Sequence, residues 1–121
     1  MIFAFLNRPG VYSEHSFIEC GEYNGYVGWT PDEGELPEGD LDDLINIHGG
    51  ITYDCIVDDE YMKKFFPKRI LTGLPRSFDG CRIIGFDTCH CDDTRENWNS
   101  DRCTRETLSL YRQVKFLLSK K

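Results

Sequence analysis

The sequence predicts an α+β fold: a single domain over residues 1–121, with a mainly antiparallel sheet, a C-terminal helix packed against it and a second, short helix. Short apolar runs separated by turn-forming residues, which are typical of strands, occur along residues 1–86. Apolar residues then recur at helical spacing over residues 103–118. A chain of 121 residues can bury one hydrophobic core but is too short for a second.

The first predicted strands are residues 1–6 and 23–29. A turn follows the first of them at residues 7–10, where proline and glycine adjoin. Residues 13–20 fit no single pattern. Residues 30–39 hold two prolines, two glycines and four acids without periodicity, which predicts a solvated loop.

A second pair of strands is predicted at residues 44–48 and 51–56. The two glycines between them, Gly49 and Gly50, suit a tight turn because glycine adopts positive φ without steric cost. The sequence therefore predicts a hairpin at this point.

The short helix is predicted over residues 58–66, with Asp58 or Asp59 as its cap and Pro67 as its end. Residues 67–80 are predicted as a long loop, and residues 81–86 as a buried strand. The C-terminal helix should begin near Ser100 or Asp101 and end before the final lysines.

Acidic residues dominate the charge of the chain, which is -7 at neutral pH. A surface of this sign repels phosphates, so direct binding to nucleic acid is not expected, whereas a basic partner protein is. The alternative is a solvated loop that only keeps the protein soluble. Seven acids are concentrated within residues 31–43, namely Asp32, Glu33, Glu35, Glu38, Asp40, Asp42 and Asp43.

The six cysteines are predicted to be reduced. The longest apolar run, residues 1–6, is too short for a membrane span or a signal peptide, so we expect a cytoplasmic protein without membrane contact. We interpret Cys20, Cys55 and Cys81 as small buried hydrophobic residues, because each lies in an apolar run. Cys89 and Cys91 are candidate metal ligands instead.

Two polar motifs, at residues 48–53 and 85–93, contain the candidate metal ligands. Imidazole, carboxylate and thiolate together favour zinc over calcium or magnesium. If the strand breaks after Asp87, then His48, Asp87 and His90 can converge on one ion. The alternative is that both histidines are hydrogen-bonded residues at strand ends and that Asp87 caps a turn. The fourth ligand would be Asp93, Cys91, Cys89 or water.

These motifs also carry a resemblance to known proteins. Over residues 23–113 the chain resembles a family of small phage and prophage proteins with the motifs N-G-Y-V, H-G-G-[IL]-T-[YF] and G-F-D-T-x-H-x-x-D, followed by a C-terminal helix. The chain departs from the family at Cys89 and Cys91, whose thiols could change the ligand set. The polar positions that the resemblance carries over are His48, Asp87, His90 and Asp93.

Small acidic phage proteins of this kind resemble anti-CRISPR proteins, among which a type II member contains zinc. The resemblance implies an inhibitor, in the cytoplasm of a host bacterium, that binds a type II CRISPR effector nuclease and blocks loading of target DNA. Such a nuclease holds its heteroduplex in a positively charged channel, to which the acidic residues would be attracted. The zinc would be structural, and no enzymatic activity is expected, because the sequence contains no G-x-S-x-G, Walker or H-E-x-x-H motif.

Two other functions remain compatible with the sequence. One is a metal-dependent hydrolase, in which Asp93 or Asp54 would act as the base. The other is a protein that sequesters a nucleotide signal. Its candidate stacking and phosphate-binding residues are Trp29, Trp98, Arg95, Arg102 and Arg105.

Overall fold

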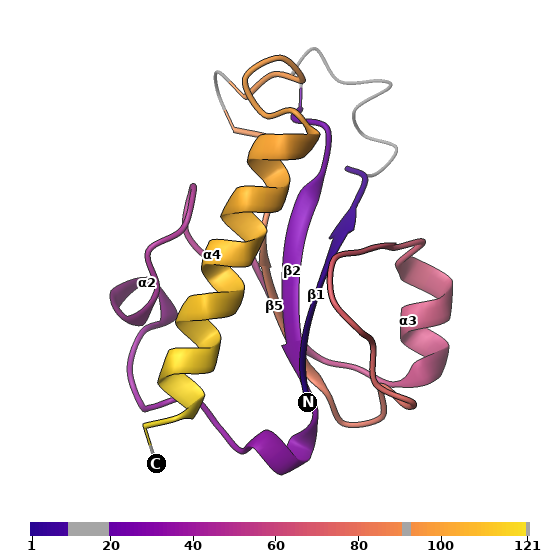
Figure 1. The fold of residues 1–121 in the computed structure, drawn as a ribbon, viewed down its shortest axis with the longest axis vertical. Coiled ribbons are helices and arrows are strands. Elements are labelled where there is room, and N and C mark those ends of the chain that lie inside the picture. The colour runs from indigo at the N-terminus through magenta and orange to yellow at the C-terminus, as the bar shows by residue number, and fades with distance from the viewer. Residues whose placement is uncertain (10–19, 91–92, 121) are drawn as a thin grey trace.

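Five antiparallel strands form one sheet in the order β3-β5-β2-β1-β4 in the computed structural model, which describes residues 1–9, 20–90 and 93–120. The sheet and its C-terminal helix confirm the predicted α+β fold (Figure 1). Residues 10–19, which include the end of the predicted first turn and most of the interval without a predicted element, are outside the described residues. The strands are β1 (Ile2–Asn7), β2 (Asn24–Trp29), β3 (Tyr53–Ile56), β4 (Arg69–Ile70) and β5 (Arg82–Phe86).

The long helix α4 (Ser100–Leu118) covers one face of the sheet, where it packs against β1 and β2 (Figure 1). It begins one residue after its cap, Asn99, whose side chain accepts a hydrogen bond from the backbone N–H of Arg102. This confirms the predicted helix. Its buried side chains are those at helical spacing: Cys103, Thr107, Leu110, Val114, Leu117 and Leu118.

The other face of the sheet is covered by α3 (Asp59–Phe65), which confirms the second predicted helix. Asp58 caps this helix by accepting a hydrogen bond from the N–H of Tyr61 at 2.8 Å. The side chains of Met62 and Phe66 are buried against this face. Because both faces are covered, β1 and β5 consist of continuous apolar runs rather than alternating ones.

The predicted hairpin over residues 44–56 is wrong in its first half. Residues 45–48 form no strand, and α2 (Leu41–Leu44) precedes them. The side-chain amide of Gln113 in α4 replaces the missing strand neighbour: it accepts from the N–H of Asn46 and donates to the carbonyl of Asn46, both at 2.8 Å. Gly49 and Gly50 do adopt positive φ, at 69° and 79°, but within a loop.

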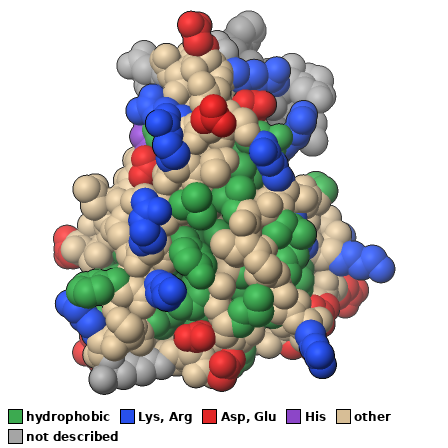
Figure 2. All heavy atoms as spheres, in the orientation of Figure 1, with side chains coloured by type: hydrophobic (Ala, Val, Ile, Leu, Met, Phe, Trp, Pro, Cys, Tyr) green, Lys and Arg blue, Asp and Glu red, His purple; other side chains and the backbone are tan. Residues whose placement is uncertain are grey.

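The sequence predicts a loop over most of the acidic run at residues 31–43, and only part of the run is one. A 3-10 turn at Pro31–Glu33 and the helix α2 interrupt it. In the view of Figure 2, which has α4 on the left and α3 on the right, hydrophobic side chains occupy the middle of the surface, lysines and arginines are scattered over it, and acidic side chains lie mainly toward its margins. Of the seven acids, all except Glu33 are exposed. Among the helices of the described residues, none has the length and apolar character needed to cross a membrane.

Candidate metal centre

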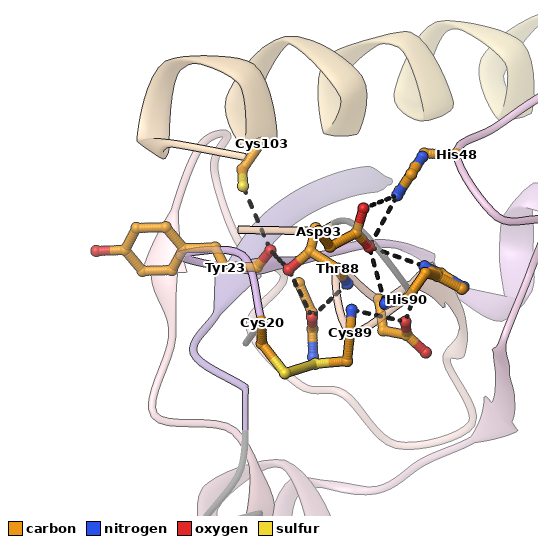
Figure 3. The surroundings of a disulfide bond; sticks show 10 residues. Cys20, Tyr23, His48, Thr88, Cys89, His90, Asp93 and Cys103 are labelled. Atoms are coloured by element: carbon orange, nitrogen blue, oxygen red, sulfur yellow. Dashed lines mark hydrogen bonds and ion pairs between the residues drawn. A yellow bond between two sulfur atoms is a disulfide. The ribbon is translucent and has the colours of Figure 1, made fainter. Parts of the chain in front are cut away.

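Asp93 lies between the rings of His48 and His90 and joins them into one cluster (Figure 3). The Nε2 atom of His48 lies 3.0 Å from each carboxylate oxygen of Asp93. The Nδ1 atom of His90 lies 3.0 Å from Oδ2 of the same carboxylate. His48, His90 and Asp93 each offer one possible ligand atom, and these three atoms lie within 4.8 Å of one another. The cluster could therefore bind a metal ion.

His48 reaches this cluster from the loop that follows α2. The Gln113 bonds to Asn46 hold the loop on one side, and on the other the N–H of Ile51 donates to Asp42 at 2.9 Å. The His48 ring packs against the indole of Trp98, with ring centroids 4.0 Å apart. The ring therefore faces Asp93 from a supported position.

His90 and Asp93 belong to the turn that follows β5. The strand stops at Phe86, and the carboxylate of Asp87 accepts a hydrogen bond from the N–H of Cys89 at 3.1 Å, which bends the chain. The predicted break after Asp87 is thus confirmed. The N–H of His90 donates to Asp93 at 2.9 Å, so the backbone as well as the ring of His90 contacts that carboxylate.

The Asp93 carboxylate is 4% exposed, and burial alone would favour its neutral form. The hydrogen bonds from His48 and His90 outweigh this burial and lower the pKa of Asp93 below its usual value. A negative charge is therefore held between two imidazoles, and this donor set of one hard oxygen and two nitrogens suits zinc.

Asp87, the other predicted carboxylate ligand, lies at the edge of the cluster. Its Oδ1 atom is 3.4 Å from Nδ1 of His90, and its side chain is partly exposed. It is not one of the three residues whose ligand atoms lie within 4.8 Å of one another. The structure thus brings together His48, His90 and Asp93, with Asp87 beside them.

The cysteines differ from the prediction at two positions, because Cys20 and Cys89 form a disulfide. The prediction that both are reduced thiols is therefore wrong, and so is the interpretation of Cys20 as a simple buried hydrophobic residue. Cys89 was a candidate metal ligand, but its bonded sulfur points away from the cluster (Figure 3). The N–H of Gly21 also donates to the carbonyl of Thr88 at 2.6 Å, so the disulfide reinforces a contact that the backbone already makes.

The remaining cysteines are mostly as expected. Cys81 is buried as predicted, whereas Cys55 is only partly buried. Burial raises the pKa of the Cys81 and Cys103 thiols, which makes both poor nucleophiles. Cys91, the other candidate ligand, lies outside the described residues.

Trp98, which the sequence predicted only as a candidate stacking residue for a nucleotide, packs against the metal-site cluster. Its indole contacts the His48 ring at 4.0 Å and the Arg102 guanidinium at 4.1 Å, and it is 3% exposed. Trp29 is equally buried. A buried indole cannot stack on a nucleotide base, so these two tryptophans give no support to nucleotide sequestration.

Gly49 is the second residue that the site requires. With its φ at 69°, an added Cβ would lie 2.5 Å from Nε2 of His90. We expect Gly49→Ala to displace the His90 ring. If the cluster binds zinc, the affinity for zinc should fall about tenfold in this variant, measured by competition with a chromophoric chelator.

The matched control is Gly39→Ala. Gly39 also has positive φ, at 135°, but its Cβ would meet only Leu44, at 3.9 Å. Equal losses of zinc affinity in the two variants would show that backbone strain, and not contact with His90, is responsible.

Comparisons with protein-family models, with curated proteins and with solved structures found no match to this chain. The resemblance to phage proteins therefore stays a prediction, and the function is argued from the geometry of the residues.

Proposed function

We propose that the chain is a zinc protein whose ion is held by His48, His90 and Asp93. The observation that carries this proposal is the convergence of two imidazoles on one buried carboxylate, with all three ligand atoms within 4.8 Å of one another. Ligand atoms around a tetrahedral zinc ion lie about 3.3 Å apart, and the two nitrogen–oxygen pairs, at 3.0 Å, are already close to that spacing.

The proposed role of the ion is structural. It would join the loop that carries His48 to the turn that carries His90 and Asp93, and these segments are 45 residues apart at their furthest. Because such a site does not exist in the unfolded chain, the free energy of zinc binding adds to the stability of the fold.

We further propose that the protein acts by contact with a basic partner, and that this partner is a type II CRISPR effector nuclease whose DNA loading it blocks. The support is the net charge of -7 and the exposure of Asp32, Glu35, Glu38, Asp40, Asp42 and Asp43. A nuclease that must expose basic surface to grip DNA would attract this surface electrostatically.

Metal-dependent hydrolysis is the second candidate function. A site with three protein ligands leaves a position for water, as in catalytic zinc sites. The side chains of His48 and His90 are 25% and 34% exposed, so solvent reaches the cluster. This observation favours an open site over a closed one.

One set of assays separates these functions. Purified protein should contain about one equivalent of zinc, bind the nuclease and reduce its DNA loading, without turning over nucleotides or phosphoesters. If it hydrolyses such substrates and His48→Ala abolishes this in a folded protein, the hydrolase replaces the structural proposal. If it neither binds the nuclease nor changes DNA loading, the inhibitor proposal fails.

A further inference from the structure

The strand β3 lies at one edge of the sheet, and its outward backbone groups face away from β5. The N–H of Val57, directly after β3, donates to the carbonyl of Cys81 at 2.9 Å. Backbone N–H and C=O groups alternate in direction along an antiparallel strand. Those of Cys55 therefore also face β5, whereas those of Asp54 and Ile56 face outward, away from the sheet. Such an edge can accept one further strand.

Two shallow hollows adjoin this edge. One, of about 480 Å³, is lined in part by Trp29, Glu35, Asp54 and Ile56. The other, of about 270 Å³, lies at the opposite end of β3 and is also lined by Asp54. The two hollows thus meet at Asp54. The Ile56 side chain is 64% exposed beside the larger one, which is unusual for isoleucine.

The charge of these hollows indicates what would dock there. Among the described residues that line them, Arg82 is the sole cation, and it is already paired with Asp54 at 2.8 Å. Because this edge is negative, a second copy of the chain would be repelled, whereas a basic segment would be attracted. The acids are Glu35, Asp40, Asp42 and Asp54.

We propose that the outer edge of β3 binds an extended, basic segment of a partner protein by strand addition. Main-chain hydrogen bonds to Asp54 and Ile56 would supply affinity, and alternate side chains of the segment would enter the hollows and select for lysine or arginine. The inference rests on the proposed function in one respect, since both take the partner to be basic.

The test uses a peptide of about eight residues in which lysine and valine alternate. Its binding to the protein is measured by calorimetry and by NMR chemical-shift changes. Shifts should centre on residues 53–56. Ile56→Pro removes an outward N–H that does not pair with β5, so binding should weaken about tenfold, whereas Ile56→Thr, which keeps the N–H, should bind nearly as wild type. Circular dichroism checks that both variants are folded.

Two charge-reversal variants provide a second test of peptide binding, because neither substitution alters the backbone of β3. Glu35→Lys should weaken peptide binding more than Glu38→Lys, since Glu35 lines a hollow and Glu38 does not. Equal effects of the two variants, or unchanged binding of a peptide N-methylated at alternate residues, would overturn strand addition. Self-association of the wild type with shifts at β3 would instead identify a second copy as the occupant and reject the basic segment.

The peptide assay contains no nuclease, so the two proposals can fail separately. Peptide binding at β3 without binding of the nuclease would reject the anti-CRISPR proposal and keep the docking edge. Inhibition of the nuclease that survives in Ile56→Pro, together with no peptide binding, would reject the docking edge and keep the inhibitor.

Discussion

Replacement of Asp93 by alanine is expected to abolish zinc binding and to lower the free energy of unfolding by about 3 kcal/mol, even without metal. The carboxylate is 4% exposed and accepts hydrogen bonds from the backbone N–H of His90 and from the rings of His90 and His48. Its removal leaves these groups, which are only partly exposed, without their acceptor. Urea denaturation and zinc titration of the same preparations measure both effects.

Asp87→Ala is the matched control for this variant. Asp87 also contacts His90, at 3.4 Å, but its side chain is 35% exposed. We expect it to retain zinc and to lose less stability than Asp93→Ala. If Asp87→Ala loses the metal while Asp93→Ala keeps it, the ligand assignment is reversed.

Reduction of the Cys20–Cys89 disulfide should lower the free energy of unfolding by up to about 4 kcal/mol, because it releases a loop that spans 69 residues. The direct measurement is thermal unfolding with and without dithiothreitol, repeated on the double variant Cys20→Ser and Cys89→Ser. Zinc binding should survive, because the bonded sulfurs point away from the cluster and the hydrogen bond from Gly21 to Thr88 remains.

Cys55→Ser controls for the loss of a thiol that forms no disulfide. It should unfold like the wild type, and dithiothreitol should still destabilise it. An unchanged melting temperature of wild-type protein after full reduction would contradict the stabilising role of the disulfide.

The parts of the fold that the sequence predicted are those governed by local pattern. The apolar run of β5 and the helical spacing of α4 each indicate an element without reference to the rest of the chain. Residues 45–48 misled the prediction because their alternation is real: Ile45 and Ile47 are buried in the core. Their backbone partner is the Gln113 side chain, which is 67 residues away from Asn46 and invisible to a local pattern.

The candidate site shows the same division. Residue chemistry identified His48, His90 and Asp93, but the preference for Asp87 over Asp93 as a first ligand came from its place at the strand end. The Asp87 side chain instead accepts a hydrogen bond from the backbone N–H of Cys89 and bends the turn. The disulfide and the packing of Trp98 against His48 depend on which distant segments meet, and spacing along the sequence carries no signal for that.

X-ray absorption at the zinc edge of the purified protein tests the central claim most directly. We expect about one zinc ion per chain with nitrogen and oxygen ligands at about 2.0–2.1 Å, two of them imidazoles, and loss of this signal in Asp93→Ala. A zinc signal without imidazole scattering, or protein that never binds zinc after exposure to it, would contradict a centre formed by His48, His90 and Asp93.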